Sequence, residues 1–367
     1  MRVGIVGGGQ LGRMLALAGY PLGLRFRCLE PYEDAPMAHL ADLELGAYDD
    51  ADALLRFARR VDVVTYEFEN VPVASARQLE RHVPVFPPPA ALEVAQDRLR
   101  EKTTFLDLGI PVPRFAAVDS RADLAHALAA IGAPAVLKTR RFGYDGKGQF
   151  VIRQPQDADA AWAALGDAPL LLEGFVEFRR ELSVLAVRGR GGETAFYPLV
   201  ENRHREGILR VSRAPAPGVS PALQALAERH ATAVLESLGY VGVLAIEFFE
   251  VSDAGGSRLL ANEMAPRVHN SGHWTIEGAE TSQFENHLRA VLGLPLGPTT
   301  PRGHSVMLNV IGTAPDAARI LAIPGAHLHL YGKTPRAGRK LGHVTVRADG
   351  AEAARAAADR VMSLLEG

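Results

Sequence analysis

Apolar residues in the first part of the chain fall into short blocks separated by stretches with helical spacing. The order is strand RVGIVG, helix QLGRMLALAGY, strand RFRCLE, a loop, helix DADALLRFARR, strand VDVVTYEF, helix VASARQLERH and strand PVFP. Strands that alternate with amphipathic helices in this way predict a parallel, Rossmann-like α/β unit. Prolines at positions 87–89 interrupt the pattern, so we place the first unit at residues 1–90.

The rest of the pattern divides into three further units. Apolar positions at helical spacing over 91–108 predict one helix, and a second helix, two strands and a glycine-rich loop follow, which gives a unit of residues 91–166. A larger unit at 167–297 carries the strands LLLEGFV, ELSVLAVRG, AFYPLVENRH and ILRVSRAP, a helix and two long apolar stretches. The Gly- and Pro-rich stretch GLPLGPTTP separates it from a small β-rich unit at 298–367. The fold class is therefore expected to be α/β at the start of the chain and α+β beyond.

Two glutamates lie in the long apolar stretches of the third unit. Glu247 in VGVLAIEFFEV and Glu263 in LLANEMA flank residues 252–257, whose composition is typical of a turn, so an antiparallel hairpin is predicted. Pairing symmetric about Gly255, with residue numbers that sum to 510, sets Glu247 opposite Glu263. Facing carboxylates repel, so the pair needs a cation, and Mg²⁺ carried with nucleotide phosphates suits it. The alternative is a pair of solvated glutamates on an ordinary hairpin.

A lysine and a glycine-rich loop in the second unit predict phosphate binding. Lys138 ends the strand AVLK, where it can hold phosphate oxygens as a point charge, and the loop at 143–149 can lay N–H groups over a polyphosphate as a mobile lid. Strand LLLEGFV runs into a break at Gly174, where free main-chain groups can pair with an adenine edge and Glu181 with ribose hydroxyls. An ordinary turn and an edge strand are the alternatives.

The first turn of the chain matches the dinucleotide-binding fingerprint. GGGQLG at 7–12 contains G-x-G-x-x-G between a strand and a helix, and Glu30 ends the next strand. The same geometry holds any phosphate at a helix N-terminus, so a phosphorylated substrate is the competing interpretation. We favour the substrate, because the rest of the sequence contains no hydride-transfer site and a nucleotide site is predicted further along.

Composition narrows the class of protein. Hydrophobic residues make up 47%, charged residues 22%, and the formal charge is −2, which is typical of a soluble globular protein and unfavourable for nucleic-acid binding. The single cysteine, Cys28, forms no internal disulfide and is expected to be a small buried apolar residue in a reducing compartment. No apolar run approaches the roughly 18 residues of a membrane helix. We expect a cytoplasmic protein without membrane contact.

Taken in order, these features resemble the ATP-grasp ligases. Within that superfamily the chain is similar to the 5-(carboxyamino)imidazole ribonucleotide synthases over nearly its whole length. The motifs that carry the resemblance are GGGQLGRML, YEFENV at 66–71, QDRLREK at 96–102, RRFGYDGKGQ at 140–149, FYPLVENRH at 196–204, APRVHNSGHW at 265–274 and YGKTPRAGRKLGH at 331–343. The resemblance implies an ATP-grasp fold with an N-terminal Rossmann-like pre-ATP-grasp domain and a small C-terminal domain.

The resemblance also implies a reaction: ATP and bicarbonate carboxylate aminoimidazole ribonucleotide through carboxyphosphate, in purine biosynthesis, in an enzyme that is usually a homodimer. Mg²⁺ would be held by Glu247 and Glu263. ATP would be held by Arg98, Lys138, Gly143, Tyr144, Asp145, Gly146, Lys147, Gly148, Gln149, Glu173, Gly174, Phe175, Val176, Glu181, His204, Asn262 and Glu263.

The remaining implied roles concern the substrates. Arg267, His269 and Asn270 are suited to hold carboxyphosphate or the CO₂ that it releases, and Asp145 is the first candidate to accept the amine proton, with Glu67 second. The ribonucleotide would be bound by Gln10 and Leu11, whose N–H groups hold its phosphate, and by Glu67, Tyr144, Asp145, Lys333, Arg339 and Lys340.

Three relatives are separated by particular segments. The ATP-grasp phosphoribosylglycinamide formyltransferase, which we keep as the alternative function, typically carries a serine-rich loop where this chain has residues 143–145 and S-P-R-x-H-D where it has 265–270. Biotin carboxylase is longer and differs at both segments. A binding module with an inactive site would lack at least one of Lys138, Glu247 and Glu263, and all three are present.

Overall fold

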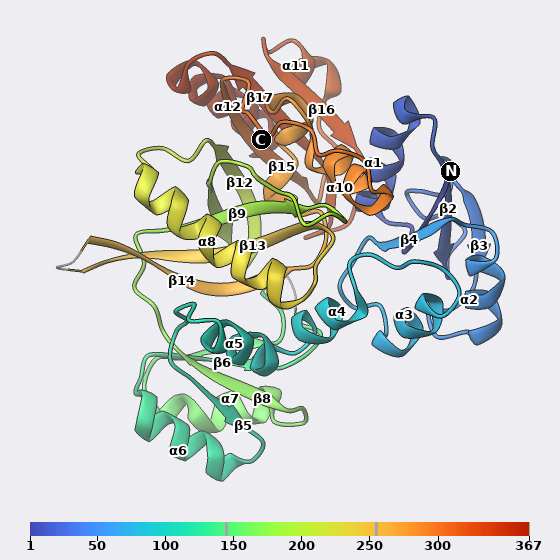
Figure 1. Cartoon of the computed structure of the whole chain (residues 1–367). Coiled ribbons are helices and arrows are strands. Elements are labelled where there is room, and N and C mark those ends of the chain that lie inside the picture. The colour runs from blue at the N-terminus through green and yellow to red at the C-terminus, as the bar shows by residue number, and fades with distance from the viewer. Residues whose placement is uncertain (144–145, 254–255, 367) are drawn as a thin grey trace.

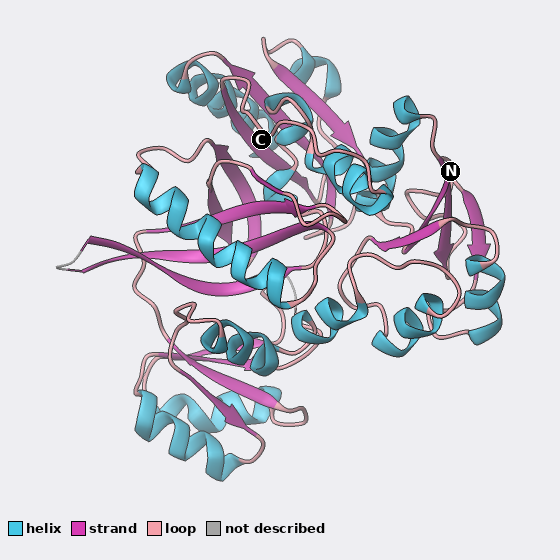
Figure 2. Cartoon of the chain, viewed as in Figure 1, coloured by secondary structure: helices cyan, strands magenta, loops and turns pink. Residues whose placement is uncertain are grey.

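The strands of the chain form three sheets in the computed structural model, which describes residues 1–143, 146–253 and 256–366 (Figure 1). Figure 2 shows that helices border each of the three sheets. In the described residues no helix is long and apolar enough to cross a bilayer. Cys28 is fully buried, as expected from its place in a strand.

The N-terminal sheet is parallel, as predicted, with the order β3-β2-β1-β4. One difference is that residues 42–45, expected in a loop, add an edge strand beside Arg27–Glu30. Another is that the predicted strand PVFP forms only one isolated bridge, between Val64 and Val85, because its prolines lack the N–H groups of a ladder. The elements are β1 (Arg2–Val6), α1 (Gln10–Gly19), η1 (Tyr20–Leu22), β2 (Arg25–Glu30), β3 (Asp42–Leu45), α2 (Ala51–Ala58), β4 (Val63–Tyr66) and α3 (Val73–Glu80).

The single helix predicted over 91–108 is two helices, α4 (Pro89–Ala95) and α5 (Arg98–Asp107). Asp97 caps α5 by accepting from the N–H groups of Leu99 and Arg100, and Gln96 donates its amide to two main-chain oxygens in the loop after β4. These polar contacts compete with helix continuation. The break places Arg98 at the first turn of α5.

The smaller sheet has the order β5-β8-β6-β7 and is antiparallel throughout. Strand β8 belongs to it, although the sequence pattern grouped this strand with the following unit. Two helices cover one face, over the alternate apolar residues Ala135 and Leu137, while Val136 and Lys138 face the other side. The elements are β5 (Phe115–Val118), α6 (Arg121–Ile131), β6 (Ala135–Thr139), β7 (Gln149–Ile152), η2 (Pro155–Asp157), α7 (Ala158–Leu165) and β8 (Leu170–Gly174).

The largest sheet has nine strands in the described residues, in the order β14-β13-β9-β11-β12-β15-β17-β16, with β10 beside β9. Its C-terminal strands continue the same ladder, because β12 pairs with β15. The boundary at 297/298 therefore separates chain segments within one sheet and stays a prediction, like the other boundaries. The elements are β9 (Arg180–Arg188), β10 (Thr194–Phe196), β11 (Val200–Arg205), β12 (Ile208–Ala214), α8 (Pro221–Ser237), β13 (Gly242–Asp253), β14 (Gly256–Ala265), η3 (Asn270–Gly272), α9 (Thr275–Gly278), α10 (Gln283–Leu292), β15 (His304–Ile311), α11 (Ala317–Leu321), β16 (Ala326–Leu330), β17 (Lys340–Ala348) and α12 (Ala351–Glu366).

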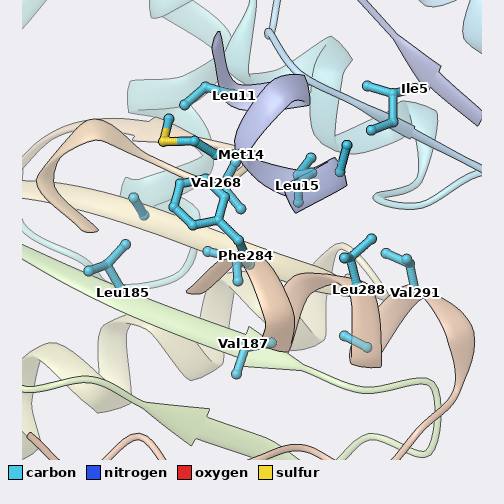
Figure 3. Packing of buried hydrophobic residues seen from close by; sticks show 14 of the residues in the cluster. Ile5, Leu11, Met14, Leu15, Leu185, Val187, Val268, Phe284, Leu288 and Val291 are labelled. Carbon is cyan, nitrogen blue, oxygen red and sulfur yellow. The ribbon is translucent and has the colours of Figure 1, made fainter. Parts of the chain in front are cut away.

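Strand β9 is buried on both faces, with period two. Its residues Leu182 and Val184 pack in a core with α8, and Leu185 and Val187 pack on the opposite face in a core with α1 and α10. Figure 3 shows Leu11, Met14 and Leu15 of α1 near Phe284 and Leu288 of α10. This packing holds the N-terminal turn against the large sheet.

Candidate functional site

One cleft with a volume of about 650 Å³ is lined by residues of the smaller and the largest sheet and by residues that follow strands of the N-terminal sheet. Its walls come from the start of α1, the loop after β4, α5, the smaller sheet and its β6–β7 loop, the β13–β14 hairpin and the C-terminal segment that includes the start of β17. The predicted site residues that line it are Gln10, Leu11, Glu67, Arg98, Lys138, Gly143, Gly146, Lys147, Gln149, Phe175, Glu181, His204, Glu247, Asn262, Glu263, Arg267, His269, Asn270 and Lys340.

One part of the cleft is apolar. Val136 and Val151 of the smaller sheet and Phe175 contribute to it, and the rings of Phe178 and Phe249 stack with centroids 4.8 Å apart. An apolar wall suits a flat heterocyclic base. The N–H groups of Gly174 and Phe175, expected to be free, instead donate to the oxygens of Arg114 and Pro134. Phe178 and Phe249 were not predicted, because the sequence does not show that they meet.

Lys138 is held by a buried carboxylate. Its Nζ donates to Glu173 Oε2 at 3.0 Å, and the Nζ of Lys102, which is fully buried, lies 3.5 Å from the same oxygen. Burial alone would raise the pKa of Glu173, but the charges of Lys138 and then Lys102 lower it to about 2. Glu173 is buried and does not line the cleft. Glu173 contacts Lys138 and Lys102 rather than the space where a nucleotide would lie.

The predicted lid connects β6 to β7. Gly146 and Gly148 have φ of 77° and 70°, in the left-handed region that favours glycine, and a Cβ on Gly148 would lie 2.5 Å from Thr139 Oγ1. The backbone therefore requires glycine at these positions. Tyr144 and Asp145 lie outside the described residues, so their predicted roles, including proton transfer by Asp145, stay predictions.

The hairpin brings Glu247 directly opposite Glu263, as predicted. The reason differs from the one expected. Towards the turn, Phe248 faces Ala261 and Ser252 faces Ser257, so paired numbers sum to 509 and Asn262 would face Glu247. A register shift between Glu247 and Phe248 leaves Asn262 as an extra residue and restores the sum of 510. The β-bulge thus places both carboxylates on the face that lines the cleft.

The two glutamates differ in their surroundings. Arg98 Nη1 lies 3.1 Å from Glu263 Oε2. Burial alone would raise the pKa of Glu263, but the charges of Arg98 and Lys138 lower it. For Glu247, burial and then the negative charge of Glu263 raise the pKa to about 7. Glu247 is therefore the carboxylate of the pair that has too little positive charge nearby to offset its burial.

These residues fit a magnesium ion bound together with phosphates. Asn262 adds a buried side-chain oxygen, Oδ1, without a hydrogen-bond partner among the described residues. Within those same residues no three His, Cys, Asp or Glu side chains form a metal-binding group. A site with two carboxylates and few other protein donors is the type that Mg²⁺ shares with nucleotide phosphates.

Arg267, His269 and Asn270 lie just after β14 in the chain and line the same cleft as the glutamate pair. Arg267 forms an ion pair with Glu69, and His269 Nε2 lies 3.5 Å from Glu247 Oε1. Both polar atoms of the Asn270 side chain are buried without a hydrogen-bond partner in the described part of the chain. Because buried amides are normally satisfied, Asn270 indicates a place for a ligand beside a cation.

The N-terminal turn differs from the prediction. The N–H groups of Leu11 and Gly12 both donate to Glu67 Oε2 at 3.2 Å, so a phosphate on the Leu11 N–H requires Glu67 to move. Gln10 accepts a hydrogen bond from Lys333. Glu30 accepts from Gly8 N–H at 2.7 Å and from the Tyr48 hydroxyl at 2.7 Å, so it serves the turn itself rather than a ribose.

Several predicted residues lie away from the cleft lining. Arg339 is half-buried and donates to the Thr334 oxygen at 3.2 Å. The predicted residues outside the lining are Gly148, Glu173, Gly174, Val176, Lys333 and Arg339.

His204, by contrast, lines the cleft and forms a hydrogen bond with Glu181 through Nδ1. Burial alone would lower the pKa of His204, but this bond and the charge of Glu247 raise it.

Three charged residues at the site had no predicted role: Glu69, Glu101 and Lys102. Glu101 accepts from the Met264 N–H at 2.6 Å, and burial followed by the charge of Glu263 raises its pKa to about 8. For Glu69, burial opposes ionisation, but the charge of Arg267 lowers its pKa to about 2. All three lie inside the motifs YEFENV and QDRLREK, which was the only available signal.

Three family models match consecutive parts of the chain. The ribonucleotide synthetase preATP-grasp domain matches residues 1–96, the ATP-grasp domain residues 103–284, and the phosphoribosylaminoimidazole carboxylase C-terminal domain residues 305–357. The predicted ATP-grasp fold with its two flanking domains is confirmed.

Individual relatives agree with these models. The N5-carboxyaminoimidazole ribonucleotide synthase of Pseudomonas aeruginosa is 58% identical over 95% of this chain and 94% of its own length. The crystal structure of the Thermus thermophilus synthetase, at 60% identity, superposes with a TM-score of 0.95 and covers 100% of this chain and 99% of that one. The Aspergillus clavatus enzyme in complex with ADP and 5-aminoimidazole ribonucleotide, at 32% identity, has a TM-score of 0.92 and covers 100% and 98%. The chain therefore belongs to the N5-carboxyaminoimidazole ribonucleotide synthase family of ATP-grasp enzymes.

Proposed function

We infer that this chain catalyses the ATP-dependent carboxylation of 5-aminoimidazole ribonucleotide to N5-carboxyaminoimidazole ribonucleotide in purine biosynthesis. The observation that carries the inference is the composition of one cleft. Lysine and arginine side chains and a glutamate pair line the same cleft as Gln10 and Leu11 at the N-terminal turn. Asn270 beside Arg267 also lines it, and its amide has no hydrogen-bond partner among the described residues. The complex of the Aspergillus clavatus relative with ADP and this ribonucleotide supports it.

Bicarbonate is the proposed source of the carboxyl group. One of its oxygens attacks the γ-phosphorus of ATP, the bond to ADP breaks, and carboxyphosphate forms. The amine nitrogen of the ribonucleotide then bonds to the carboxyl carbon, the carbon–oxygen bond to phosphate breaks, and the amine proton passes to a carboxylate, for which we propose Asp145. Phosphate leaves.

The proposed residue roles follow from charge and position. Lys138 and Arg98 face the polyphosphate, and the lid excludes water from carboxyphosphate, which is short-lived in water. Arg267, His269 and Asn270 hold the carboxyl group. Mg²⁺ held by Glu247 and Glu263 would neutralise phosphate charge. We also propose a homodimer and a cytoplasmic location, and sedimentation of the purified protein tests the first.

A substrate-swap assay tests the function. We expect ADP release that depends on bicarbonate and is stimulated by 5-aminoimidazole ribonucleotide. Turnover with glycinamide ribonucleotide and formate, and none with the first pair, would instead assign the formyltransferase activity. ADP release without stimulation by either ribonucleotide would contradict both.

Asp145→Asn is expected to abolish carboxylation while ATP binding persists, because the amide has no basic oxygen for the amine proton. The measurements are ribonucleotide-dependent turnover and the Kd for ATP. Carboxylation at the wild-type rate would remove the proposed role of Asp145.

A further inference from the structure

A continuous line of buried polar side chains runs under η3 to the ring of His269. Ser212 Oγ donates to Asn202 Oδ1 at 2.7 Å, Asn202 Nδ2 donates to Ser183 Oγ at 3.0 Å, and Ser183 Oγ donates to Ser271 Oγ at 2.8 Å. Ser271 Oγ lies 2.9 Å from His269 Nδ1. The three serines are fully buried and Asn202 is 3% exposed. We call Ser212, Asn202, Ser183 and Ser271 the polar chain.

The large sheet positions the polar chain on the cleft side. Ser183 of β9 pairs with Glu247 of β13, and Asn202 of β11 pairs with Ser212 of β12, so each pair shares one face of the sheet. Ser271 in η3, which packs against β11 and β12, contacts the hydroxyl of Ser183. Four polar residues in a buried layer would be costly unless each satisfied the next, and here each does.

The direction of the hydrogen bonds decides the protonation of His269. An amide oxygen only accepts, so Ser212 must donate to Asn202 Oδ1, and each later donor then points towards His269. The last donor in the series is the Ser271 hydroxyl, which donates a hydrogen bond to His269 Nδ1. The Ser271 main-chain N–H also points at Nδ1, at 3.3 Å. Two donors at Nδ1 leave the ring proton on Nε2.

The other ring nitrogen of His269, Nε2, lies on the side of the cleft and of Glu247. His269 Nε2 lies 3.5 Å from Glu247 Oε1 and the side chain lines the cleft. Because Nδ1 accepts hydrogen bonds from the Ser271 hydroxyl and the Ser271 main-chain N–H, it carries no proton, and the ring is neutral. A neutral ring with its proton on Nε2 donates one hydrogen bond into the cleft and offers no basic nitrogen there.

We propose that the polar chain fixes His269 as a hydrogen-bond donor towards the cleft, which makes Ser183, Asn202, Ser212 and Ser271 positioning residues for the reaction. The identity of the acceptor, the carboxyl group on its way to the ribonucleotide, rests on the proposed function; the tautomer itself does not. Exchange of the oxygen and nitrogen of the Asn202 amide would reverse the chain and withdraw the Ser271 proton from Nδ1, so the tautomer is a decisive observable.

The first test reads the tautomer in the unaltered protein. Two-bond ¹H–¹⁵N spectra of protein labelled with ¹⁵N-histidine report whether Nδ1 or Nε2 carries the proton, and loss of one signal set in His269→Gln assigns it. We expect the Nε2–H form for His269 at pH 7.5. The Nδ1–H form would overturn the proposal without any need for a variant that folds.

The second test separates positioning from a structural role. We expect Ser271→Ala and Ser183→Ala to populate the Nδ1–H form and to lower kcat roughly 10-fold, with KM for ATP unchanged, because a donor is lost only where charge develops. Ser183→Thr keeps the hydroxyl and should restore both readouts. Ser305→Ala is the matched control, since Ser305 is a buried strand serine whose Oγ has no hydrogen-bond partner in the described residues, and it should change neither.

The outcomes distinguish this proposal from the proposed function. If Ser271→Ala and Ser183→Ala keep both the wild-type tautomer and the wild-type kcat, the polar chain does not position His269. If the wild type shows no turnover with 5-aminoimidazole ribonucleotide, the proposed function fails, while the spectra still decide whether the polar chain sets the tautomer.

Discussion

Glu247→Gln lowers turnover on the order of 1,000-fold and, at pH 8 without metal, raises the melting temperature by about 2–4 °C. Both effects come from one carboxylate. Glu247 faces Glu263 across the hairpin, and its pKa is raised to about 7, first by burial and then by the charge of Glu263. The carboxylate is thus unfavourable in the metal-free fold and useful only when a cation is bound. Turnover and thermal melting with and without Mg²⁺ and ADP measure the two effects.

The pH dependence has a definite sign. A carboxyl whose pKa is raised in the folded state, from 4.5 to about 7, binds its proton more tightly there than in the unfolded chain. Its ionisation therefore costs stability as the pH rises from 4.5 to about 7, and the full cost remains above that. Below pH 4.5 the carboxyl is protonated in both states, so the variant and the wild type should melt alike there.

Added Mg²⁺ and nucleotide should reverse the order of stability at pH 8, because only the wild type keeps both carboxylates. Glu280→Gln is the control: Glu280 is exposed and pairs with Arg302 at the surface, so its loss should leave turnover and the Mg²⁺ response unchanged. A Glu247→Gln enzyme with wild-type Mg²⁺-dependent turnover would contradict the assignment of the glutamate pair.

Glu247 and Glu263 also show how much of the site could be predicted from the sequence. Hairpin composition was enough to predict that Glu247 and Glu263 meet, but the turn uses a register in which Asn262 would face Glu247. The β-bulge at Asn262 shifts the register by one residue, so that Glu247 faces Glu263 instead. A bulge adds one residue to one strand in response to packing on both faces, and the residues near the turn carry no sign of it.

Contacts between distant segments were equally hard to predict. The Glu69–Arg267 pair joins the loop after β4 to the segment after β14, and Glu67 occupies N–H groups at the start of α1 that were expected to be free. Local pattern predicted the N-terminal strands and helices because their periodicity is set by neighbours in the sequence. The pairing of charges across the cleft depends instead on how the three sheets are packed.

The second large effect is expected at Lys102, a residue that touches neither the cleft nor solvent. Its Nζ lies 3.5 Å from Glu173 Oε2 and donates to the Ala261 oxygen at 3.3 Å. Lys102→Met leaves Glu173 buried with Lys138 as its remaining partner, and loss of one partner of a buried ion pair costs about 3–5 kcal/mol. We expect about 3 kcal/mol here, because Lys138 retains part of the interaction. Chemical denaturation measures it.

Nucleotide binding should weaken in the same variant. With Lys102 absent, Lys138 becomes the main charge that neutralises Glu173, so less of the Lys138 charge is available to phosphate. We therefore expect a roughly 10-fold higher Kd for ATP in a titration. Arg121→Met, which breaks the exposed pair with Asp159, is the control and should change neither quantity.

The double variant Lys102→Met, Glu173→Gln separates the two effects. Removing the carboxylate as well abolishes the uncompensated buried charge, so most of the lost stability should return, and Lys138 is released towards the phosphates. Additive losses of stability in the double variant would mean that Lys102 acts through its contact with Ala261 and not through Glu173. Recovered stability with recovered ATP affinity is the result that the buried geometry predicts, since both properties then depend on the same carboxylate.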